Sequence, residues 1–359
     1  MRIVVDVTPL FNPLTGIGNY WVGMLGGLAE AAGDEHEVVA FAITGPRRRR
    51  PIVRALDGIE VRRRLLVVPP SAQTWRRLWS RAGRPPVEWL AGRLDVFHRS
   101  DWMTPAQRHG IRATTIHDLG PLHHPELVAP LTRRMHVTSA RDAATACDVV
   151  FCNARFTARD VHETLGVPEE RLRVAYPGIH PRFRDEGERR DLGAPYVLAV
   201  GTDEPRKNLA RLQEAHRLLR ARGSELGLVL AGGAGWLAEH RAGDGVHALG
   251  YVRDDALPPL YRGASVYCYP SLFEGFGMPV LEAMACGTPV VASSHPSLDE
   301  ACGDVAVRTD PSDPEAIADS IERALALPGE TIERGFEHAA RFTWRACGEA
   351  VLASYRSVS

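Results

Sequence analysis

The chain has 359 residues and a formal net charge of −1, with 45% hydrophobic and 24% charged residues. This composition is that of an ordinary globular protein and excludes a disordered or collagen-like chain. The length suits two α/β domains better than a single core.

The cysteines and the first residues bear on cellular location. The six cysteines, at positions 147, 152, 268, 286, 302 and 347, form no C-x-x-C pair and have no metal-ligand spacing. Five lie in apolar or small-residue contexts, so we expect buried thiols in a reducing compartment. The start M-R-I-V-V-D-V resembles a strand rather than a signal peptide, and no apolar run approaches the roughly 18 residues of a membrane helix. We therefore expect a cytoplasmic protein, with peripheral contact at the inner face of the membrane as an alternative.

Strand and helix patterns alternate along almost the whole chain, which predicts parallel sheets with helices on both faces. In the first half we expect strands at 2–7, 37–42, 59–67, 95–98, 113–117, 149–152 and 172–176, and helices at 18–32, 73–92, 127–147 and 157–165. The charged stretch 181–194 predicts a linker. In the second half we expect strands at 196–201, 227–231, 246–249, 265–269, 289–292 and 305–307, and helices at 209–222, 257–263, 279–285 and 314–327.

The charge is unevenly distributed. From Arg47 to Arg99 the sequence has 14 arginines against four acidic residues, a net charge of +10, and three tryptophans, Trp75, Trp79 and Trp89. Trp75 and Trp79 are four positions apart and would share a helix face. Cations with interfacial tryptophans suit an anionic membrane surface. A solvated arginine-rich face with core tryptophans is an equally weighted alternative, whereas nucleic-acid binding is disfavoured because no such module is present.

Residues 269–293, Y-P-S-L-F-E-G-F-G-M-P-V-L-E-A-M-A-C-G-T-P-V-V-A-S, carry the most informative pattern. Glu274 and Glu282 are eight positions apart, and the Gly-rich turn 275–277 leads into a short helix expected to begin near Pro279. Such a turn presents free N–H groups at a helix N-terminus and can bind an anion. Because carboxylates flank this turn, we expect a ligand with hydroxyls on both sides of its phosphates, as in a nucleotide sugar.

This pattern resembles the E-x7-E signature of the retaining glycosyltransferases of family 4, and the resemblance covers nearly the whole chain. It implies an α/β GT-B fold, in which two Rossmann-like domains face each other across a cleft and the last helix crosses back to the first domain. We expect an N-terminal acceptor-side domain at 1–182 and a nucleotide-sugar-binding domain at 183–342. The segment 343–359 would supply the returning helix.

Two motifs of the first half follow expected strands. Gly16 and Gly18 open a helix where backbone N–H groups can approach phosphate, and the resemblance places this loop over the donor diphosphate. A dinucleotide fingerprint would need a third Gly where Trp21 stands, so a plain tight turn is the alternative. His117 ends a later strand, as catalytic groups often do. The family has a His here, near the transferred sugar; a structural His is the alternative. The expected acceptor-side residues are Asn19, Tyr20 and Asp118.

The second half opens with V-G-T-D-E-P-R-K-N-L. Arg206 and Lys207 precede a helix whose N-cap could be Asn208 and would bind the diphosphate leaving group; a pair of surface bases is the alternative. Thr202 stands where many relatives carry Arg, which leaves the phosphate-contacting arginine open. By resemblance, Glu282 binds the ribose and Glu274 the sugar hydroxyls. The further expected donor-binding residues, for several of which a turn glycine is the alternative, are Gly232, Gly233, Tyr251, Val252, Gly275, Phe276, Gly277, Met278 and Pro279.

The resemblance implies that a hexose moves from a nucleoside diphosphate sugar to an acceptor hydroxyl with retained configuration. The leaving phosphate itself would accept the acceptor's proton on the front face of the sugar. No D-x-D motif is present, and we expect neither a metal nor a cofactor. The segments T-G-I-G-N-Y, T-I-H-D-L and P-R-K-N-L look most like bacterial mannosyl- or rhamnosyl-type transferases of cell-surface polysaccharide assembly. We therefore favour GDP-mannose as donor, with UDP-sugars next, and a sugar or lipid-linked acceptor.

Other classes fit less well. A nucleotide-sugar 2-epimerase of the same fold is the nearest alternative enzyme. A non-catalytic nucleotide-sugar binder would be expected to lose part of the combination of loop glycines, His117, Lys207 and both Glu residues. An NAD-dependent oxidoreductase would need the missing glycine fingerprint, and phosphorylase-type enzymes are far longer.

Overall fold

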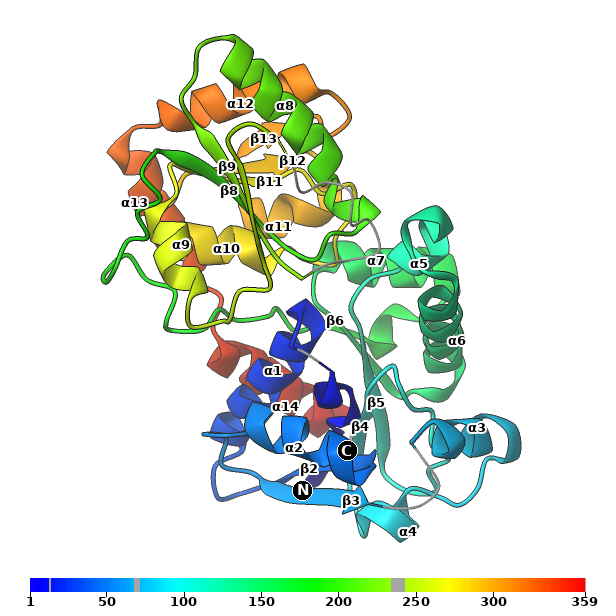
Figure 1. Cartoon of the computed structure of the whole chain (residues 1–359). Coiled ribbons are helices and arrows are strands. Elements are labelled where there is room, and N and C mark those ends of the chain that lie inside the picture. The colour runs from blue at the N-terminus through cyan, green and yellow to red at the C-terminus, as the bar shows by residue number, and fades with distance from the viewer. Residues whose placement is uncertain (13, 68–71, 234–242, 359) are drawn as a thin grey trace. The chain divides into compact units, whose positions relative to one another are not determined.

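The computed structural model describes residues 1–12, 14–67, 72–233 and 243–358 (Figure 1). The chain divides into two compact units. Unit 1 comprises Met1–Pro125, Ala129–Gly178 and Thr343–Ser359, and unit 2 comprises Glu126–Val128 and Ile179–Phe342. Each unit has one parallel sheet covered by helices, which confirms the expected α/β class.

The sheet of unit 1 has the strand order β3-β2-β1-β4-β5-β6-β7, with every neighbouring pair parallel. Its central strands are runs of β-branched and aromatic residues buried on both faces, as a helix-covered parallel sheet requires. The strands are β1 (Arg2–Asp6), β2 (Glu37–Thr44), β3 (Arg62–Val67), β4 (Val96–Arg99), β5 (Ile111–Ile116), β6 (Val149–Cys152) and β7 (Leu172–Val174).

The helices of unit 1 differ from the expectation at three places, one of which is the short helix at 120–123, where none was expected. The helix expected at 73–92 is two helices, because Gly83 at φ +58° and the prolines at 85 and 86 interrupt it. A helix also forms over the arginine run 46–55, which has no clear apolar period. The α-helices are α1 (Gly16–Ala32), α2 (Pro46–Ala55), α3 (Ala72–Ala82), α4 (Glu88–Ala91), α5 (Gly120–His123), α6 (Pro130–Ala146), α7 (Arg155–Leu165) and α14 (Trp344–Val358).

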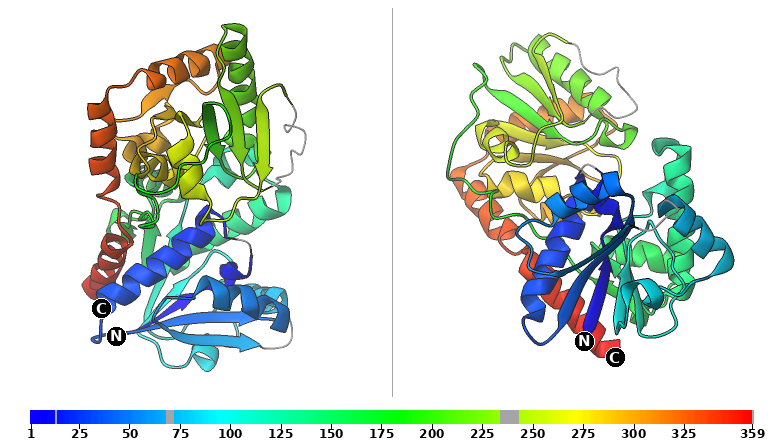
Figure 2. Two further views of the ribbon diagram at one scale, coloured as in Figure 1. Left: turned by 60° about the vertical axis from the view of Figure 1, so that its left-hand side comes forward. Right: turned by 60° about the horizontal axis from the view of Figure 1, so that its bottom comes forward.

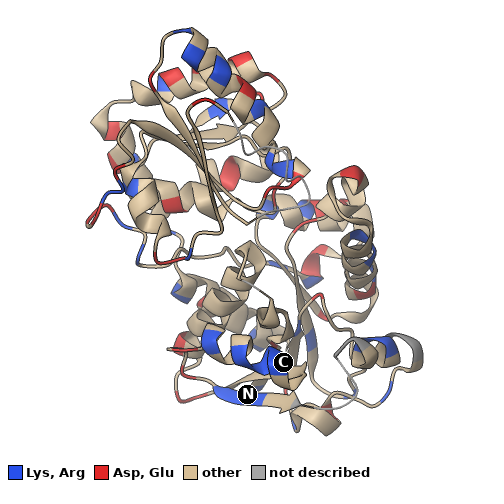
Figure 3. Cartoon of the chain, viewed as in Figure 1, with Lys and Arg blue, Asp and Glu red and all other residues tan. Residues whose placement is uncertain are grey.

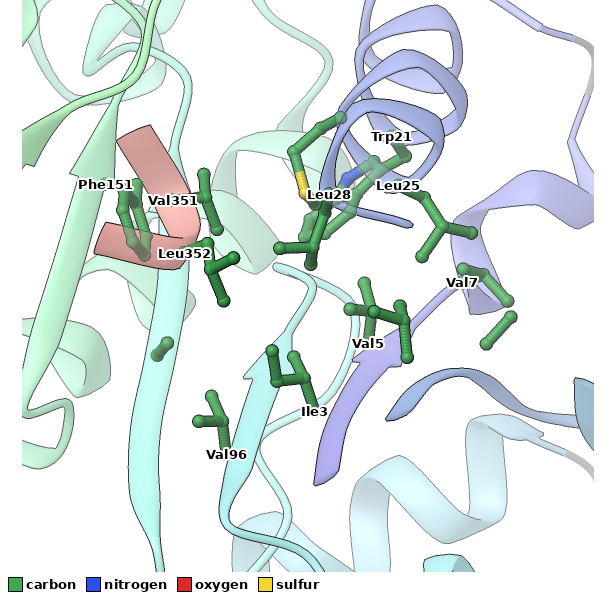
Figure 4. Close-up of a cluster of buried hydrophobic side chains, with 14 of the residues drawn as sticks. Ile3, Val5, Val7, Trp21, Leu25, Leu28, Val96, Phe151, Val351 and Leu352 are labelled. Carbon is green, nitrogen blue, oxygen red and sulfur yellow. The ribbon is translucent and has the colours of Figure 1, made fainter. Parts of the chain in front are cut away.

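The core of unit 1 lies between the sheet, α1 and the C-terminal helix α14. Figure 4 shows Leu25 and Leu28 of α1 above Ile3 and Val5 of β1, with α14 beside them. The two helices run side by side (Figure 2), and a Cβ atom on Gly348 of α14 would lie 2.0 Å from the backbone carbon of Gly27 in α1. The last helix therefore packs on the first sheet unit, as expected.

A buried imidazole also ties α14 to the sheet. His98 of β4 bonds through Nδ1 to the Tyr355 hydroxyl at 2.6 Å and through Nε2 to the Thr115 hydroxyl at 3.0 Å. Burial lowers the pKa of His98 to about 3, so the ring is neutral at physiological pH.

The sheet of unit 2 has the order β10-β9-β8-β11-β12-β13, again with parallel neighbours. Its strands are β8 (Tyr196–Val200), β9 (Gly227–Ala231), β10 (Val246–Gly250), β11 (Val266–Tyr269), β12 (Val290–Ser293) and β13 (Val307–Thr309). Its α-helices are α8 (Leu209–Ala221), α9 (Leu257–Gly263), α10 (Met278–Ala285), α11 (Asp299–Cys302), α12 (Pro314–Leu325) and α13 (Gly329–Ala339), of which α11 and α13 were not predicted. The stretch 181–194 packs on α9, where Arg262 donates to the carbonyls of Glu188 and Arg184 at 2.7 and 3.0 Å.

Both sheets reverse their winding direction at a central pair of strands. The reversal lies between β1 and β4 in unit 1 and between β8 and β11 in unit 2. Ligands of open α/β sheets bind at the carboxyl ends of strands next to such a reversal. The residues that follow β1, β4, β8 and β11 are therefore the first candidates for a binding site.

The arginine-rich region 47–99 mixes exposed charge with core aromatics. Figure 3 shows the blue arginines of α2 and β3 on unit 1. Trp75 and Trp79 share a face of α3, as predicted, with ring centroids 5.6 Å apart, and both join a core cluster, whereas Trp89 is 71% exposed. Residues 68–71 of this region, and the side chain of Arg81, lie outside the described residues.

Two further sequence expectations can be compared with the structure. All six cysteines are free and buried, as predicted. Among the described residues, none of the helices combines the length and the apolar character needed to cross a bilayer.

Candidate active site

A cluster of charged side chains lies at the carboxyl edge of the unit 2 sheet. Arg206 and Lys207 lie in the 3-10 turn η4 (Pro205–Lys207) after β8, and Glu274 lies in the loop after β11. Glu274 is only 7% exposed. Its Oε1 accepts a hydrogen bond from Lys207 Nζ at 2.7 Å, and its Oε2 accepts one from Arg206 Nη1 at 2.6 Å.

The two cations keep the Glu274 carboxylate ionised. Burial alone would raise the pKa of Glu274, but the charges of Arg206 and Lys207 outweigh it and lower the pKa to about 2. The sequence assigned Glu274 to sugar hydroxyls and the cations to phosphate. In the structure these three side chains contact one another.

Lys207 is the only lysine in a sequence otherwise supplied with arginine. Burial, and then the charge of Arg206, lower its pKa to about 8, although Glu274 acts in the opposite direction. An arginine would stay charged throughout, whereas a compact lysine ammonium fits a small site and can titrate. Lys207 therefore differs from the arginines around it in size and in its ability to lose its charge near neutral pH.

Two residues that the sequence reasoning missed complete the cluster. Tyr269, the last residue of β11, accepts a hydrogen bond from Lys207 Nζ at 2.6 Å, and its ring centroid lies 4.6 Å from that nitrogen. Glu204 accepts a hydrogen bond of 2.9 Å from Arg206 Nε. The available signals were the placement of Tyr269 at a strand end and of Glu204 two residues before Arg206.

Asn208 is the N-cap residue of the helix that follows Lys207, as expected, but its side chain has a different role from the one that is usual at this position. Asn208 does occupy the N-cap position of α8, with φ at +58°, but its side chain makes no capping hydrogen bond. Its Nδ2 instead donates to the carbonyls of Pro270 and Pro311 at 3.1 and 2.6 Å. Asn208 therefore fixes the loop that carries Glu274 relative to η4.

Helix α10 begins where the Gly-rich turn ends. Gly277 occupies its N-cap position at φ +102°, where a Cβ atom would lie 2.6 Å from Leu298. Met278 and Pro279 form the first turn, and Phe276 packs on Phe342 with ring centroids 5.4 Å apart. Only glycine therefore fits at position 277 of this turn.

Glu282 lies on α10 and differs electrostatically from Glu274. Its Oε2 accepts a hydrogen bond from the Tyr261 hydroxyl at 3.0 Å. Burial raises the pKa of Glu282 to about 7, and this hydrogen bond opposes the shift only in part. The two carboxylates of the motif therefore sit in environments that move their pKa values apart.

Glycines at the ends of β8, β9 and β10 surround a small pocket. Gly201, Gly232, Gly233 and Gly250 line it together with Asp203. A Cβ atom on Gly232 would lie 1.8 Å from the Gly201 carbonyl oxygen, so this position excludes any side chain. Of the other expected donor-side residues, Thr202 follows Gly201 and is partly buried, Tyr251 is 59% exposed beyond β10, and Val252 follows it.

The remaining predicted residues lie in unit 1. Gly16 begins α1, and a Cβ atom on Gly18 would lie 3.0 Å from Leu14. Asn19 and Tyr20 follow; Tyr20 is buried, and its ring centroid lies 4.9 Å from that of His117. His117 follows β5 and bonds through Nδ1 to the Asn153 amide at 3.0 Å, while Asp118 accepts the Gly120 N–H at 2.9 Å.

The structure thus brings the predicted residues together in two groups, one at the carboxyl edge of each sheet. The unit 2 group centres on Arg206, Lys207 and Glu274, and the unit 1 group on His117. Within the described residues, no three His, Cys, Asp or Glu side chains converge as metal ligands.

Comparison with known proteins identifies the family of the chain. The sequence family described as "Glycosyltransferase Family 4" matches residues 14–183, and "Glycosyl transferases group 1" matches residues 182–343. The chain is 28% identical to the O-antigen chain mannosyltransferase B of Escherichia coli, over 99% of this chain and 100% of that protein. It is 30% identical to a D-inositol 3-phosphate glycosyltransferase of Acidothermus cellulolyticus, over 74% of this chain and 67% of that protein.

The fold itself recurs in solved structures. The sucrose-phosphate synthase of Thermosynechococcus elongatus superimposes with a TM-score of 0.70 over 99% of this chain and 98% of that one, at 20% identity. This likeness confirms the GT-B architecture. With two family matches that together span almost the whole sequence, the chain belongs to glycosyltransferase family 4, whose members are retaining enzymes that transfer a sugar from a nucleotide sugar to an acceptor.

Proposed function

We propose that the enzyme moves mannose from GDP-mannose to a hydroxyl of a sugar or lipid-linked acceptor during assembly of a cell-surface glycan. The observation that carries the proposal is the buried contact of Arg206 and Lys207 with Glu274, next to the Gly-rich turn of α10. The O-antigen mannosyltransferase name of a full-length relative favours mannose as the sugar.

The cations act on the leaving group. As the bond between the anomeric carbon and the phosphate oxygen breaks, negative charge develops on the departing GDP, and Arg206 and Lys207 stabilise it. Each preorganised donor of this kind is worth about 3 kcal/mol of barrier. Two cations beside a helix N-terminus supply the charge that a divalent metal would otherwise provide, so we propose that turnover needs no added metal.

The acceptor reacts on the face from which the diphosphate departs. The acceptor oxygen bonds to the anomeric carbon, and its proton passes to the leaving phosphate oxygen, so the configuration is retained. Glu274 then binds sugar hydroxyls and Glu282 the ribose. The loop at Gly16 and Gly18 covers the diphosphate, and His117 lies near the transferred sugar. Each of these roles is carried over from the family motifs.

The remaining donor contacts are proposed in the same way. The backbone near Tyr251 and Val252 meets the base, and the glycines around the small pocket allow the nucleotide to approach. Asn19, Tyr20 and Asp118 belong to the acceptor side. Of these three residues, Tyr20 is buried, and its role in the acceptor site would be indirect, through the contact of its ring with His117.

A lipid-linked acceptor also fits the basic surface of unit 1. Arg47, Arg49 and Arg50 are exposed on α2, and Arg62 is exposed on β3. Each cation near anionic headgroups contributes about 1 kcal/mol of binding. We propose that this surface holds the enzyme peripherally at the inner face of the membrane.

The donor proposal is tested by thermal unfolding with GDP-, UDP-, ADP- and dTDP-sugars in the presence of a chelator. A ligand at a hundred times its dissociation constant stabilises the folded protein by about 2.7 kcal/mol. We expect GDP-mannose to give this shift and Glu282→Ala to lose it, while Glu337→Ala, an exposed residue on α13, keeps it. Equal shifts with every nucleotide, or none, would contradict the GDP-mannose assignment.

A further inference from the structure

Among the described residues, several buried polar atoms of unit 1 have no hydrogen-bond partner, and three of them belong to residues that follow the ends of neighbouring strands. These three atoms are Asp101 Oδ1, His117 Nε2 and Asn153 Oδ1. Asp101 lies beyond the end of β4, His117 directly follows β5, and Asn153 directly follows β6. These three strands are neighbours in the sheet, so their carboxyl ends lie at one edge. Leaving even one such group buried without a partner costs about 1–3 kcal/mol.

The contact between Asn153 and His117 fixes which atoms donate. The Asn153 amide donates from Nδ2 to Nδ1 of His117 at 3.0 Å. Nδ1 is then an acceptor, so the proton of the neutral ring is on Nε2. Burial lowers the pKa of His117, which keeps the ring in this neutral form. The unpartnered set therefore comprises one donor, His117 Nε2–H, and two acceptors.

His136 on α6 holds the first of these acceptors. Its Nδ1 lies 2.9 Å from Asp101 Oδ2, which leaves the other oxygen of the carboxylate facing elsewhere. Burial alone would raise the pKa of Asp101, but the hydrogen bond from His136 lowers it, so Asp101 is ionised at neutral pH. The pKa of His136 is correspondingly raised, because its bond to Asp101 outweighs the effect of burial.

We propose that Asp101, Asn153 and His117 form a binding site for the hydroxyls of a sugar, with His136 positioning Asp101. A polyol supplies the two O–H donors that the carboxylate and amide oxygens accept, and a hydroxyl oxygen that accepts from the imidazole. The fully ionised diphosphate of a nucleotide sugar has no proton to donate to Asp101, and its negative charge would be repelled by that carboxylate. The inference rests on the proposed function, since the sugar is either the hexose of the donor or that of the acceptor.

The decisive variant is Asp101→Asn, which keeps the shape of the side chain and removes its negative charge. Asn153→Ala removes the second acceptor, and His136→Gln keeps a donor to Asp101 without the imidazole. Asp160→Asn is the matched control, because Asp160 on α7 forms another imidazole–carboxylate pair of the same unit, with His123 at 2.7 Å. Circular dichroism and thermal unfolding establish that each variant is folded.

Two measurements separate the two sources of the sugar. Calorimetry gives the dissociation constants of GDP and of GDP-mannose, so that their ratio isolates the contribution of the donor's hexose. Release of GDP from GDP-mannose, with methyl α-glycosides of mannose, glucose and galactose added in turn, gives the KM of a neutral acceptor sugar.

We expect Asp101→Asn and Asn153→Ala to keep the parent affinity for GDP. Each should weaken either GDP-mannose binding or the glycoside KM at least tenfold, with a smaller effect for His136→Gln and none for Asp160→Asn. The first pattern assigns the site to the donor's hexose and the second to the acceptor. A folded Asp101→Asn in which neither quantity changes overturns the inference, even if kcat falls. A parent enzyme that binds neither GDP nor GDP-mannose overturns the proposed function itself.

Discussion

Lys207 donates a hydrogen bond of 2.7 Å to Glu274 across 67 positions of sequence. The two residues follow β8 and β11, the strands between which the unit 2 sheet reverses. Arg206 bonds to the other oxygen of the same carboxylate. The carboxylate therefore holds both cations in place, and a bound diphosphate would share them with it.

Replacing Lys207 tests its proposed role in turnover. Lys207→Ala should lower kcat by about two orders of magnitude, because a preorganised cation at the leaving group is lost. The dissociation constant of the donor should change less, since Arg206 remains. Steady-state kinetics with GDP-mannose separate the two effects, and a kcat at the parent level would show that Lys207 has no such role.

Lys207→Arg is the more demanding comparison. It preserves the charge, but a planar guanidinium is larger and cannot occupy the buried position between Tyr269 and Glu274 in the same way. We expect kcat to stay depressed at least tenfold. Full activity in Lys207→Arg would mean that charge alone suffices at this position.

The pKa of Lys207 can be measured directly because the sequence has no other lysine. Protein labelled with carbon-13 lysine should give one side-chain ε signal, titrating near pH 8 in the free enzyme. The charged form is the active one, so kcat/KM for the donor should fall as the pH rises through this value. A midpoint close to 10.5, the ordinary lysine value, would contradict the burial argument.

Tyr269 should control that titration. Its hydroxyl accepts a hydrogen bond from the ammonium, which favours the charged form, so Tyr269→Phe should lower the pKa of Lys207 and move the alkaline fall in activity to lower pH. Tyr267→Phe is the matched control, since Tyr267 is a buried neighbour on β11 whose ring lies 5.9 Å from that of Tyr269. If Lys207 had the same pKa in both variants, Tyr269 would have no specific influence on the charge of Lys207.

Glu282 predicts an unusual dependence of stability on pH. Its folded pKa of about 7 lies above the ordinary 4.5, so ionisation opposes folding increasingly as pH rises from 4.5 through 7. Glu282→Gln removes this cost and should stabilise the protein at pH 8 by up to about 3 kcal/mol, but not at pH 5. Urea unfolding at both pH values checks this.

Glu274 should behave with the opposite sign. Its pKa is lowered from 4.5 to about 2, so its contribution to stability is present above pH 4.5 and is lost as the pH falls toward 2. Glu274→Gln should destabilise the protein at neutral pH.

The contrary outcome for Glu282 is also clear. A Glu282→Gln variant that is destabilised equally at pH 5 and pH 8 would show that Glu282 is not buried as described.

The contact between α1 and α14 is tested by two neighbouring glycines. A Cβ atom on Gly27 would lie 1.8 Å from the Trp344 carbonyl oxygen, whereas one on Gly26 would meet nothing within 4 Å. Gly27→Ala should destabilise unit 1 by about 1–3 kcal/mol through overpacking. Gly26→Ala should stabilise it by about 0.5–1 kcal/mol, because alanine restricts the unfolded chain. Urea unfolding of the two variants compares them, and similar stabilities would contradict this close packing.

Local sequence patterns predicted most of the fold. The apolar runs, and the helix patterns between them, predicted the strands of both sheets, because a buried parallel strand has to be apolar on both faces. The failures have local causes. Gly83 and the two prolines after it split a predicted helix, and the arginine run of α2 lacks the apolar period by which a helix is recognised.

The sequence named several residues of the candidate site, but it missed Tyr269 and Glu204 and did not reveal the contacts among them. Strand ends and glycine turns pointed to Lys207, Glu274 and His117, because these positions carry local signals. No local signal reveals that Lys207 bonds to Tyr269, or that His136 on a helix meets Asp101 beyond a strand end, since only the folded topology brings these residues together. The sequence correctly placed Asn208 at the N-cap of α8, but it could not show that its amide nitrogen donates to two distant proline carbonyls and that its oxygen accepts from Arg211.

The central claim is that this enzyme transfers mannose from GDP-mannose with retained configuration. The most direct measurement is real-time proton NMR of GDP-mannose with the enzyme and no added metal, following the anomeric signal of the first mannose released to water or to a methyl glycoside. We predict that the α-anomer appears first and that Lys207→Ala slows its appearance by about two orders of magnitude. Intact GDP-mannose with the parent enzyme, or the β-anomer appearing first, would contradict the account.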